Sequence, residues 1–354
     1  MKLAVTGGAG FIGSNFVRYM LRKYPTYSIL NLDNLTYSGN LENLSDVLGN
    51  ARHQFLKADI CDPDAMLQAL SEGVDAVVHF AAESHVDRSI LDGSVFVKTN
   101  VLGTQCLLAA AHRAGVRRFV HVSTDEVYGS ALAGQKFRED SPLSPNSPYA
   151  ASKAASDLLA RAYFQTYRFP AIVTRCSNNF GPYQFPEKFI PLLISRALED
   201  QSILIYGDGL QVRDWIFVED HCRALDVILH GGREGEIYHI AAGNEWPNLE
   251  IAGRILDLLH KPHSLLTHVQ DRPGHDRRYS LDSTKLTSEL GWAPETRFAQ
   301  GLATTINWYV ANAEWRERIQ NQAYRSYYRE QYEQREDTLK RVRNPAGSPK
   351  CASS

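Results

Sequence analysis

Several features are scarce in this sequence, and each scarcity excludes a class of protein. No apolar run approaches the ~20 residues that a helix needs to cross a bilayer. Residues 2–6 begin a strand pattern directly, without the layout of a signal peptide. The formal net charge is only -2, so no broad positive field exists for nucleic acid or an anionic membrane. We expect a cytoplasmic protein with neither of those partners.

Cysteine and histidine motifs are also missing. The five cysteines have no CxxC spacing, which favours reduced thiols in a cytosolic protein over a disulfide framework. The twelve histidines form no ligand motif such as HExxH. The sequence therefore predicts no metal site.

The apolar pattern predicts an α/β fold. Short apolar runs alternate with amphipathic segments, and this alternation places helices on both faces of a parallel sheet. The predicted strands are residues 2–6, 28–32, 54–58, 76–81, 118–123 and 171–176. The predicted helices include residues 12–23, 63–71 and 95–114. We expect a doubly wound parallel (Rossmann) sheet with a smaller, mixed C-terminal lobe that binds substrate.

The regular alternation of predicted strands and helices ends after Cys176. A loop follows, and then segments that contain proline and are rich in aromatic residues. We therefore predict two interleaved units without a long linker. The predicted units are a dinucleotide-binding domain at residues 1–176, with segments near 211–242 returning to it, a mainly substrate-binding lobe at 177–330, and a polar, disordered tail at 331–354.

A glycine-rich turn joins the first predicted strand to the first predicted helix. Gly7, Gly10 and Gly13 form GxxGxxG, a variant of the dinucleotide fingerprint. Glycine permits the tight turn and the close approach of backbone to a pyrophosphate, which the helix N-terminus attracts. Asp33 closes the second strand twenty residues after Gly13, where a carboxylate binds the ribose hydroxyls of the adenosine. No arginine neighbours Asp33, which favours NAD over NADP.

Asp59 and Ile60 follow the third predicted strand and are placed to meet the adenine. The alternative for Asp59 is a helix N-cap ahead of Pro63. The glycine turn also has a purely structural alternative, but the strand before it and the helix after it are those of a dinucleotide site.

Tyr149 and Lys153 form YxxxK at the start of a helix-like segment. Residues four apart share one helix face, so the phenol and the ammonium project together. A nearby cation stabilises phenolate, and we expect Lys153 to lower the pKa of Tyr149. With the glycine turn upstream and Thr124 at the end of the fifth strand, the combination resembles the extended short-chain dehydrogenase/reductase superfamily. The resemblance makes Tyr149 the base and Thr124 the hydroxyl that binds the substrate alcohol.

Asp125 and Glu126 directly follow Thr124, at the carboxyl end of a predicted parallel strand. A simple alcohol dehydrogenase or an epimerase needs only the hydroxyl, the tyrosine and the lysine. An adjacent pair of acids suggests an added elimination, in which one group removes a proton α to a ketone and the other protonates a leaving hydroxyl. The alternative is that both acids cap a turn or lie in solvent.

Several longer blocks make the resemblance closer, and together they are similar to the dTDP-glucose 4,6-dehydratase family. These blocks are residues 33–40, 81–89, 123–129, 177–182, 186–191, 213–215 and 271–276. The resemblance implies a cycle of three steps. Tyr149 removes the 4-OH proton of the sugar while NAD⁺ accepts the C4 hydride. Glu126 takes the C5 proton while Asp125 protonates the leaving C6 hydroxyl, and the hydride then returns to C6.

A cofactor that is regenerated in each turnover must stay tightly bound. The resemblance implies contacts to NAD from the turn, from the ends of the strands and from the catalytic pair. The implied residues are Gly7, Gly10, Phe11, Ile12, Gly13, Asp33, Asn34, Thr36, Asp59, Ile60, Ala81, Ala82, Ser84, Thr99, Tyr149, Lys153 and Asn179.

The resemblance also implies a site for a dTDP-sugar substrate. Arginine recognises phosphates through its bidentate fork, and Arg213 and Arg272 are implied at the diphosphate. The other implied substrate residues are Lys188 and His275 near the diphosphate, Ser84, His85, Thr124 and Asn178 at the sugar, and Asn248 at the nucleotide. Each has an alternative as a surface or turn residue. Residues 241–247 depart from the sequence pattern expected for the family, so the segment assigned to base recognition matches the family least.

Three further expectations complete the prediction. The resemblance implies a homodimer that pairs residues 95–114 and 152–167 with those of a partner. The alternative enzyme is a dehydratase or 4-epimerase acting on a UDP- or GDP-sugar. A non-catalytic NAD(P)-sensing protein is expected to lack Tyr149 or Lys153, and both residues are present.

Overall fold

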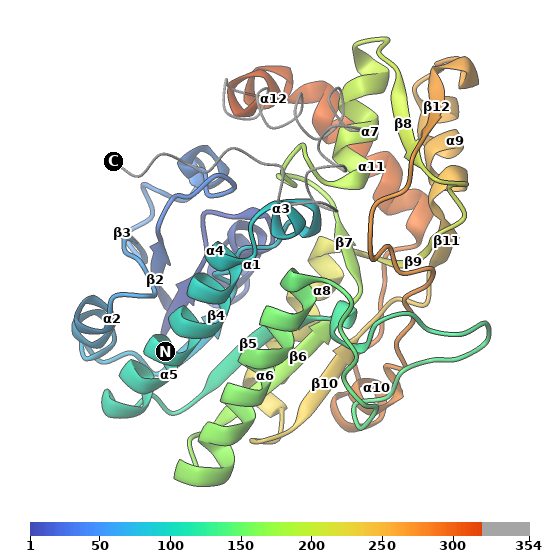
Figure 1. The fold of residues 1–354 in the computed structure, drawn as a ribbon. Coiled ribbons are helices and arrows are strands. Elements are labelled where there is room, and N and C mark those ends of the chain that lie inside the picture. The colour runs from blue at the N-terminus through green and yellow to red at the C-terminus, as the bar shows by residue number, and fades with distance from the viewer. Residues whose placement is uncertain (321–354) are drawn as a thin grey trace, which may run out of the picture.

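A seven-stranded sheet forms the centre of the computed structural model, which describes residues 1–320 (Figure 1). Its neighbouring strands all pair in parallel, in the order β10-β6-β5-β4-β1-β2-β3. The strands are β1 (Lys2–Thr6), β2 (Ser28–Asp33), β3 (His53–Lys57), β4 (Ala76–His79), β5 (Phe119–Thr124), β6 (Ala171–Cys176) and β10 (Ile237–Ile240). This topology confirms the predicted fold class.

The order of the strands fixes where a ligand can bind. The chain builds outward from β1 to β3, returns to β4 beside β1, and then builds outward in the other direction. A crevice opens at the carboxyl ends of the strands where the order reverses, and doubly wound folds bind ligands there.

Helices cover both faces of the sheet. On one face lie α1 (Phe11–Lys23), α8 (Val218–Gly231) and α10 (Thr284–Leu290), packed around residues such as Leu3 and Val5. On the other face lie α2 (Pro63–Leu70), α5 (Thr104–Arg113) and α6 (Pro148–Tyr167), packed around Ala4 and Val77. Successive strand residues alternate between the faces, so a buried parallel strand is apolar on both sides.

The helical prediction over residues 95–114 is confirmed, but the pattern did not reveal a π-helical segment within it. After α3 (Val86–Leu91) the helix runs without a break through α4 (Ser94–Phe96), the π-helix η2 (Val97–Gly103) and α5. The Asn100 side chain lies within the π-helix, accepts a hydrogen bond from Glu83 N at 2.9 Å and donates one to Glu83 O at 2.9 Å. These contacts hold the widened turns against the chain after β4, and Thr99 lines the central cavity.

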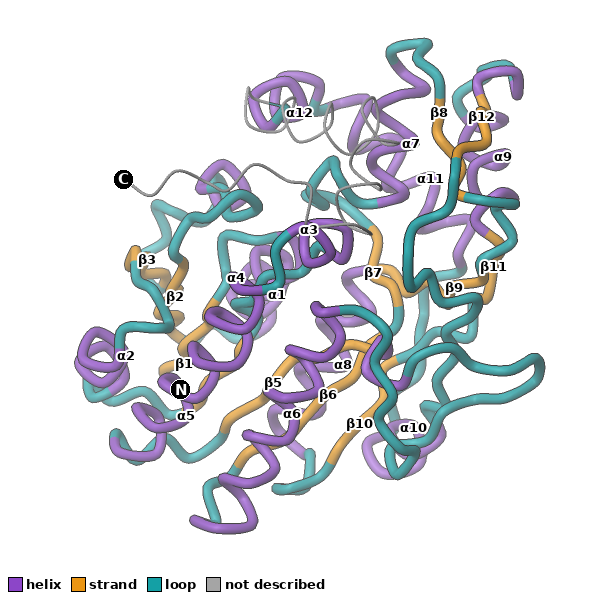
Figure 2. The backbone as a smooth tube through the Cα atoms, viewed as in Figure 1, coloured by secondary structure: helices purple, strands orange, loops and turns teal. Residues whose placement is uncertain are grey.

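A second lobe lies beside the carboxyl ends of the large sheet (Figure 2). Its strands are β7 (Asn178–Phe180), β9 (Val212–Phe217) and β11 (Glu245–Pro247) in one sheet, and β8 (Ile203–Tyr206) and β12 (Leu266–Val269) in another. Its helices are α7 (Phe189–Leu198), α9 (Asn248–Leu258), α11 (Phe298–Ala311) and α12 (Ala313–Ile319). Phe180, Trp215 and Tyr309 are part of its own apolar core.

Short elements complete the chain: the 3₁₀ helices η1 (Leu41–Leu44), η3 (Asp125–Tyr128) and η4 (His263–Leu265). Of the predicted returning segment 211–242, α8 packs on the large sheet and β10 joins it, whereas β9 pairs with β7 and β11. The predicted tail at 331–354 lies outside the described residues, as does the end of the predicted lobe from residue 321. Among residues 1–320, none of the helices combines the length and the apolar character that a bilayer crossing requires.

Candidate active site

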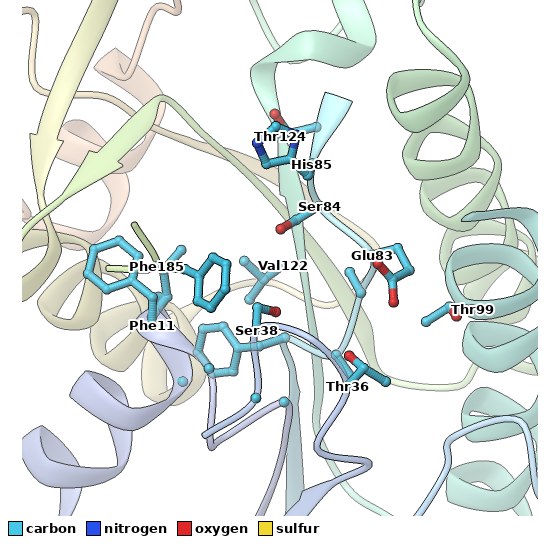
Figure 3. A pocket seen from close by; sticks show the side chains of 18 of the residues that line it. Phe11, Thr36, Ser38, Glu83, Ser84, His85, Thr99, Val122, Thr124 and Phe185 are labelled. Carbon is cyan, nitrogen blue, oxygen red and sulfur yellow. The ribbon is translucent and has the colours of Figure 1, made fainter. Parts of the chain in front are cut away.

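A cavity of about 420 Å³ lies at the carboxyl ends of the strands, where the strand order reverses. Every residue predicted to bind the cofactor lines this cavity, as do all five predicted catalytic residues. In Figure 3, Phe11 and Phe185 lie on one side of the cavity, and Glu83 and Thr99 lie on the other. The fold therefore brings together residues that are far apart in the sequence.

The glycine turn is shaped to admit a phosphate group. Gly7 has a φ of +71°, and a Cβ atom there would lie 2.6 Å from Ala81 N. A Cβ atom at Gly13 would lie 2.3 Å from Gly7 O, so only glycine lets the turn and the first helix approach so closely. Gly10 is the N-cap of α1 and has no side chain to bond the free N–H groups of the first turn. That turn also contains no acidic residue. The N–H groups at this helix end suit the diphosphate of a dinucleotide.

Asp33 is held rigidly at the end of β2. Its Oδ2 accepts a hydrogen bond from Ala9 N at 2.9 Å, and its Oδ1 accepts one from Leu35 N at 2.8 Å. Each carboxylate oxygen retains a lone pair for a ribose hydroxyl. These contacts tie the carboxylate to the glycine turn, so the two parts of a dinucleotide site are positioned together.

Asp59 does not cap the following helix. The side chain of Asp62 caps α2 instead, by accepting hydrogen bonds from Asp64 N and Ala65 N. Asp59 accepts a hydrogen bond at 3.2 Å from Asn34 Nδ2, and both residues line the cavity. The capping alternative for Asp59 is therefore wrong.

Lys153 and Tyr149 are buried on α6, in the floor of the cavity. The Lys153 ammonium donates a hydrogen bond to Val122 O at 2.8 Å, and burial lowers the pKa of this lysine to about 8. Burial raises the pKa of Tyr149 well above its ordinary value, the Glu126 carboxylate raises it further, and a hydrogen bond with Thr124 opposes both. The expectation of a lowered Tyr149 pKa is thus wrong, because burial and Glu126 outweigh the opposing hydrogen bond.

Asp125 and Glu126 begin η3, directly after β5. Thr124 is the cap of this turn: its Oγ1 accepts a hydrogen bond from Glu126 N at 3.3 Å and donates one to Asp125 Oδ1 at 3.2 Å. Asp125 is only 3% exposed, and its Oδ2 has no hydrogen-bond partner within residues 1–320. The two acids therefore neither cap the turn nor lie in solvent, and both line the cavity.

The surroundings of these two acids differ. Burial raises the pKa of Asp125 well above its ordinary value, and the neighbouring Glu126 raises it further. Burial also raises the pKa of Glu126, but Arg272, Arg213 and Lys188 act in the opposite direction. The environment thus favours a protonated Asp125 next to a more acidic Glu126, which is the arrangement of an acid and a base.

A second cavity, of about 160 Å³, extends from the first toward the smaller lobe. His85, Glu126, Asn178 and Lys188 line both cavities. The predicted substrate residues that line only the second are Arg213, Asn248, Arg272 and His275. The predicted cofactor and substrate residues therefore form two adjoining spaces that meet at Glu126.

The cations of the second cavity are fixed from behind. Arg213 donates a hydrogen bond to Asp276 O at 2.9 Å and lies over the ring of Tyr279 at 4.1 Å. Arg272 forms an ion pair with Asp87 at 3.0 Å, while its Nε has no partner among the described residues. Among the described residues Arg272 has one carboxylate partner, Asp87, whereas Arg213 is held by a carbonyl oxygen and an aromatic ring, so guanidinium N–H groups remain to bind a diphosphate.

Several cavity residues were missed by the sequence prediction. Asp87 lies within the block 81–89, and Tyr279 lies three residues beyond the block 271–276, so both had a nearby signal. Phe185 immediately precedes another block. Tyr206 ends β8 in the smaller lobe, and no motif pointed to it because only the tertiary fold brings it to the cavity.

Comparison with known proteins places this site in a family. The sequence profile of the GDP-mannose 4,6-dehydratase family matches residues 4–305. A dTDP-glucose 4,6-dehydratase of Streptomyces niveus is 51% identical over 325 residues, which are 91% of this chain and 96% of the relative. The crystal structure of DesIV, a dTDP-glucose 4,6-dehydratase from Streptomyces venezuelae with NAD and TYD bound, is 54% identical. Its TM-score is 0.88, over 90% of this chain and 100% of DesIV.

A UDP-glucose 4-epimerase from Thermus thermophilus, solved with NAD, shares the fold at lower identity. It is 30% identical with a TM-score of 0.82, over 88% of this chain and all of the epimerase. The glycine turn, the parallel sheet and the Tyr149–Lys153 pair define the extended short-chain dehydrogenase/reductase class. Within that class, the chain belongs to the dTDP-glucose 4,6-dehydratase family, which confirms the predicted resemblance.

Proposed function

We propose that this chain catalyses the NAD-dependent dehydration of dTDP-glucose to dTDP-4-keto-6-deoxyglucose. The observation that carries the proposal is the pair Asp125 and Glu126, which are adjacent in sequence and placed in different electrostatic surroundings beside Tyr149 and Lys153. Oxidation alone does not require such a pair, whereas elimination of water requires both an acid and a base.

The cavity at the glycine turn fits NAD. When bound, the dinucleotide accepts a hydride from C4 of the sugar and later donates it to C6. Tyr149 then takes the proton of the 4-hydroxyl, and Thr124 hydrogen-bonds the same oxygen. The Lys153 ammonium lies one helical turn from the phenol, and a cation there favours the phenolate form, while burial acts in the opposite direction and raises the Tyr149 pKa.

Water is lost in the second step. The 4-ketone acidifies the proton on C5, and the Glu126 carboxylate removes it. Asp125 holds a proton because burial raises its pKa, and it delivers this proton to the departing C6 hydroxyl. When the hydride has returned to C6, Glu126 gives a proton back to C5 and is again a carboxylate. Exchange with solvent then returns a proton to Asp125 and removes from Tyr149 the proton taken from the 4-hydroxyl.

The second cavity binds the substrate. Arg213 and Arg272 bind the diphosphate, with Lys188 and His275 beside them. Burial, followed by the two arginines, lowers the pKa of His275 to about 3, so the imidazole is neutral and acts through hydrogen bonds. The remaining sugar contacts come from Ser84, His85 and Asn178. Asn248 begins α9, and its buried Oδ1 has no partner in the described chain, which suits a contact to the nucleotide.

The alternative is a dehydratase or 4-epimerase acting on a UDP- or GDP-sugar. An epimerase has no use for the paired acids, so Asp125 and Glu126 argue against it. The preference for one nucleotide base depends mainly on the region around Asn248. Residues 241–247 in this region depart from the sequence pattern expected for the family.

The test is a product assay with dTDP-, UDP- and GDP-hexoses in deuterated water. We expect only dTDP-glucose to give the 4-keto-6-deoxy product efficiently, with deuterium from solvent at C5. The matched control is dTDP-galactose, which differs from dTDP-glucose at C4 alone. Retention of the original hydrogen at C5 would contradict the elimination, and preference for another nucleotide would support the alternative.

We also propose that the chain is a homodimer located in the cytoplasm. Exposed apolar side chains gather on two adjoining elements that the resemblance assigns to the interface: Val97 is 57% exposed, Leu102 51% and Leu158 55%. Contiguous apolar surface of this kind marks interaction sites. The four described cysteines are free, as in a reducing compartment.

A further inference from the structure

One face of the large sheet changes from apolar to largely polar along its strands. Near the amino ends of the strands, the face beneath α5 and α6 is apolar, with Ala4, Val77, Phe119 and Ala171. Toward the carboxyl ends, the same face carries six buried polar side chains beside the apolar Leu32 and Val173: Thr6, His79, His121, Ser123, Arg175 and His239. The opposite face is mostly apolar at these levels, with Val5, Val78, Val122 and Ile240, and carries the buried Thr174.

The polar positions form a continuous row because the strands are in register. Thr6 pairs with His79, and His79 pairs with His121. One pleat further along, Ser123 and His239 both pair with Arg175. Buried parallel strands normally read as continuous apolar runs, so three buried polar residues at each of two successive levels require a reason beyond packing.

The row meets α6 at Asp157, which is 2% exposed. Asp157 Oδ2 accepts a hydrogen bond from Arg175 Nε at 2.8 Å, and its Oδ1 lies 3.3 Å from His121 Nε2. Asp157 follows Lys153 by four residues and Tyr149 by eight, so the three side chains descend one helix face. The order from the cavity inward is phenol, ammonium and carboxylate.

Few of the groups around Lys153 carry a charge. His79 on β4 and His121 on β5 are neutral, because burial and the nearby Lys153 hold both pKa values low, that of His121 at about 4. The Cys176 thiol on β6 is neutral because burial raises its pKa to about 12. Tyr128 and His239, beyond Arg175, are neutral as well.

In the cavity, Tyr149 and Asp125 favour their protonated forms, while Glu126 faces the cations of the substrate site.

The charges that remain at this level are those of Lys153, Asp157 and Arg175. Burial acts to raise the pKa of Asp157, but the nearby His121 and the Arg175 charge outweigh burial and keep the carboxylate ionised. Without that carboxylate, Lys153 and Arg175 would be buried with no anion between them, since the Glu139 carboxylate lies at the far end of the row, where it accepts a hydrogen bond from His239 N. Burial of unpaired charge is costly, and the lysine, unlike the arginine, can escape the cost by losing its proton.

We propose that Asp157 is a positioning residue that keeps the Lys153 ammonium charged and in place beside Tyr149. The polar row anchors Asp157 through Arg175 and His121, so the charge is fixed at one distance from the lysine. The Lys153 pKa agrees with this arrangement, since burial lowers it while Asp157 is the first group that raises it. The proposal rests on the proposed function for the roles of Tyr149 and Lys153.

The test is the pH profile of Asp157→Asn, which removes the charge and keeps the shape. Turnover of dTDP-glucose by the wild-type enzyme should fall above about pH 8, as Lys153 loses its proton. In Asp157→Asn this basic limb should move to lower pH by about one unit, so that activity relative to wild type falls about ninefold at pH 9 and only about twofold at pH 7. Asp157→Glu should restore the limb. The matched control is Ser156→Ala, which removes a neutral contact to His121 and should leave the limb in place.

Two results would overturn the proposal. One is an equal loss of activity by Asp157→Asn at every pH together with a lower melting temperature, which is the behaviour of a structural ion pair. The other comes from Arg175→Gln, which removes the opposing cation and keeps the carboxylate. This variant should move the limb upward, and it carries the test if Asp157→Asn does not fold. A downward shift in Arg175→Gln would contradict the assignment.

The affinity for NAD⁺ as a function of pH gives a second readout that needs no sugar. Lys153 is placed to hold the nicotinamide ribose, so the basic limb of binding should shift in the same direction for each variant. If the wild-type enzyme left dTDP-glucose unchanged, the proposed function would fail, and the NAD⁺ profiles would still decide the role of Asp157. Identical binding limbs in wild type and Asp157→Asn would exclude that role.

Discussion

At the scale of single residues, Asp125 and Glu126 show how neighbours acquire different chemistry. Both acids follow the end of one strand, and burial raises the pKa of each. Arg213 lowers both pKa values, but Arg272 and Lys188 act on Glu126 as well, and their charges favour its ionised form. The division into acid and base thus follows from the second cavity and not from the peptide that carries the pair.

Glu126→Gln should separate oxidation from elimination. The amide cannot accept the C5 proton, so we expect reduced NAD to accumulate on the enzyme while turnover falls by about 10² to 10⁴. Absorbance at the wavelength of reduced nicotinamide, followed after mixing with dTDP-glucose, measures the first step alone. Solvent deuterium should not enter C5 in this variant.

The matched control is Asp125→Asn, one residue earlier. This variant retains the base and loses the acid, so C5 should exchange with solvent deuterium although little product forms. If both variants exchanged C5 equally, the separate roles of the two residues would be excluded.

Residue types and spacing were sufficient to predict Tyr149, Lys153 and the acidic pair as one constellation. They were not sufficient to predict the pKa of Tyr149. Helical spacing places the phenol and the ammonium on one face, but the hydrogen bond from Lys153 to Val122 O and the approach of Glu126 depend on how strands pack against α6. Burial is a property of the tertiary fold, and here it reverses the direction expected from the pair alone.

At the scale of elements, the turn between β1 and α1 depends on the absence of side chains. Gly13→Ala would place a Cβ atom 2.3 Å from Gly7 O and 2.8 Å from Gly8 Cα, which are backbone atoms that cannot move aside. We expect the variant to lose NAD binding and to be destabilised by about 1 to 3 kcal/mol. Fluorescence titration with NAD⁺ and thermal unfolding measure the two effects.

Gly49→Ala is the control for that experiment, because a Cβ atom at Gly49 meets nothing within 4 Å. It should bind NAD⁺ as the wild type does and unfold at nearly the same temperature. Tight binding by Gly13→Ala would show that the turn does not approach the diphosphate as closely as we infer.

Elements differ in how well the sequence predicts them. The strands of the large sheet were predicted to within about two residues, because each is a short apolar run that ends at a turn. The helix over 95–114 was predicted, but its π-helical segment was not, because that segment is accompanied by hydrogen bonds between Asn100 and the backbone of Glu83. A helical pattern does not reveal a contact with a segment that precedes it by seventeen residues.

At the scale of the whole molecule, the smaller lobe was the least predictable part. Its three-stranded sheet joins β7, β9 and β11, which come from segments about thirty residues apart. Short strands separated by irregular chain leave no periodic signal, and their pairing is decided by a shared core around Phe180 and Trp215. The lining of the substrate cavity is hard to predict for the same reason, because Tyr206 and Asn248 reach the cavity from that lobe.

The proposed dimer can be tested on the exposed face of α6. Leu158→Glu replaces an apolar side chain that is 55% exposed with a charge. In a two-fold interface the change occurs twice, and each buried leucine contributes about 1.5 to 3 kcal/mol. We therefore expect the variant to be monomeric at concentrations where the wild type is a dimer, as measured by light scattering after size exclusion.

Leu210→Glu is the control, because Leu210 is 45% exposed and lies in a turn of the smaller lobe, away from α6. It should remain dimeric. Residues of one chain line both the cofactor cavity and the substrate cavity. We therefore expect a Leu158→Glu monomer to still reduce NAD⁺ with dTDP-glucose. A variant that stayed dimeric would place the interface elsewhere. A monomer without activity would show that the partner stabilises α6, which carries Tyr149, Lys153 and Asp157.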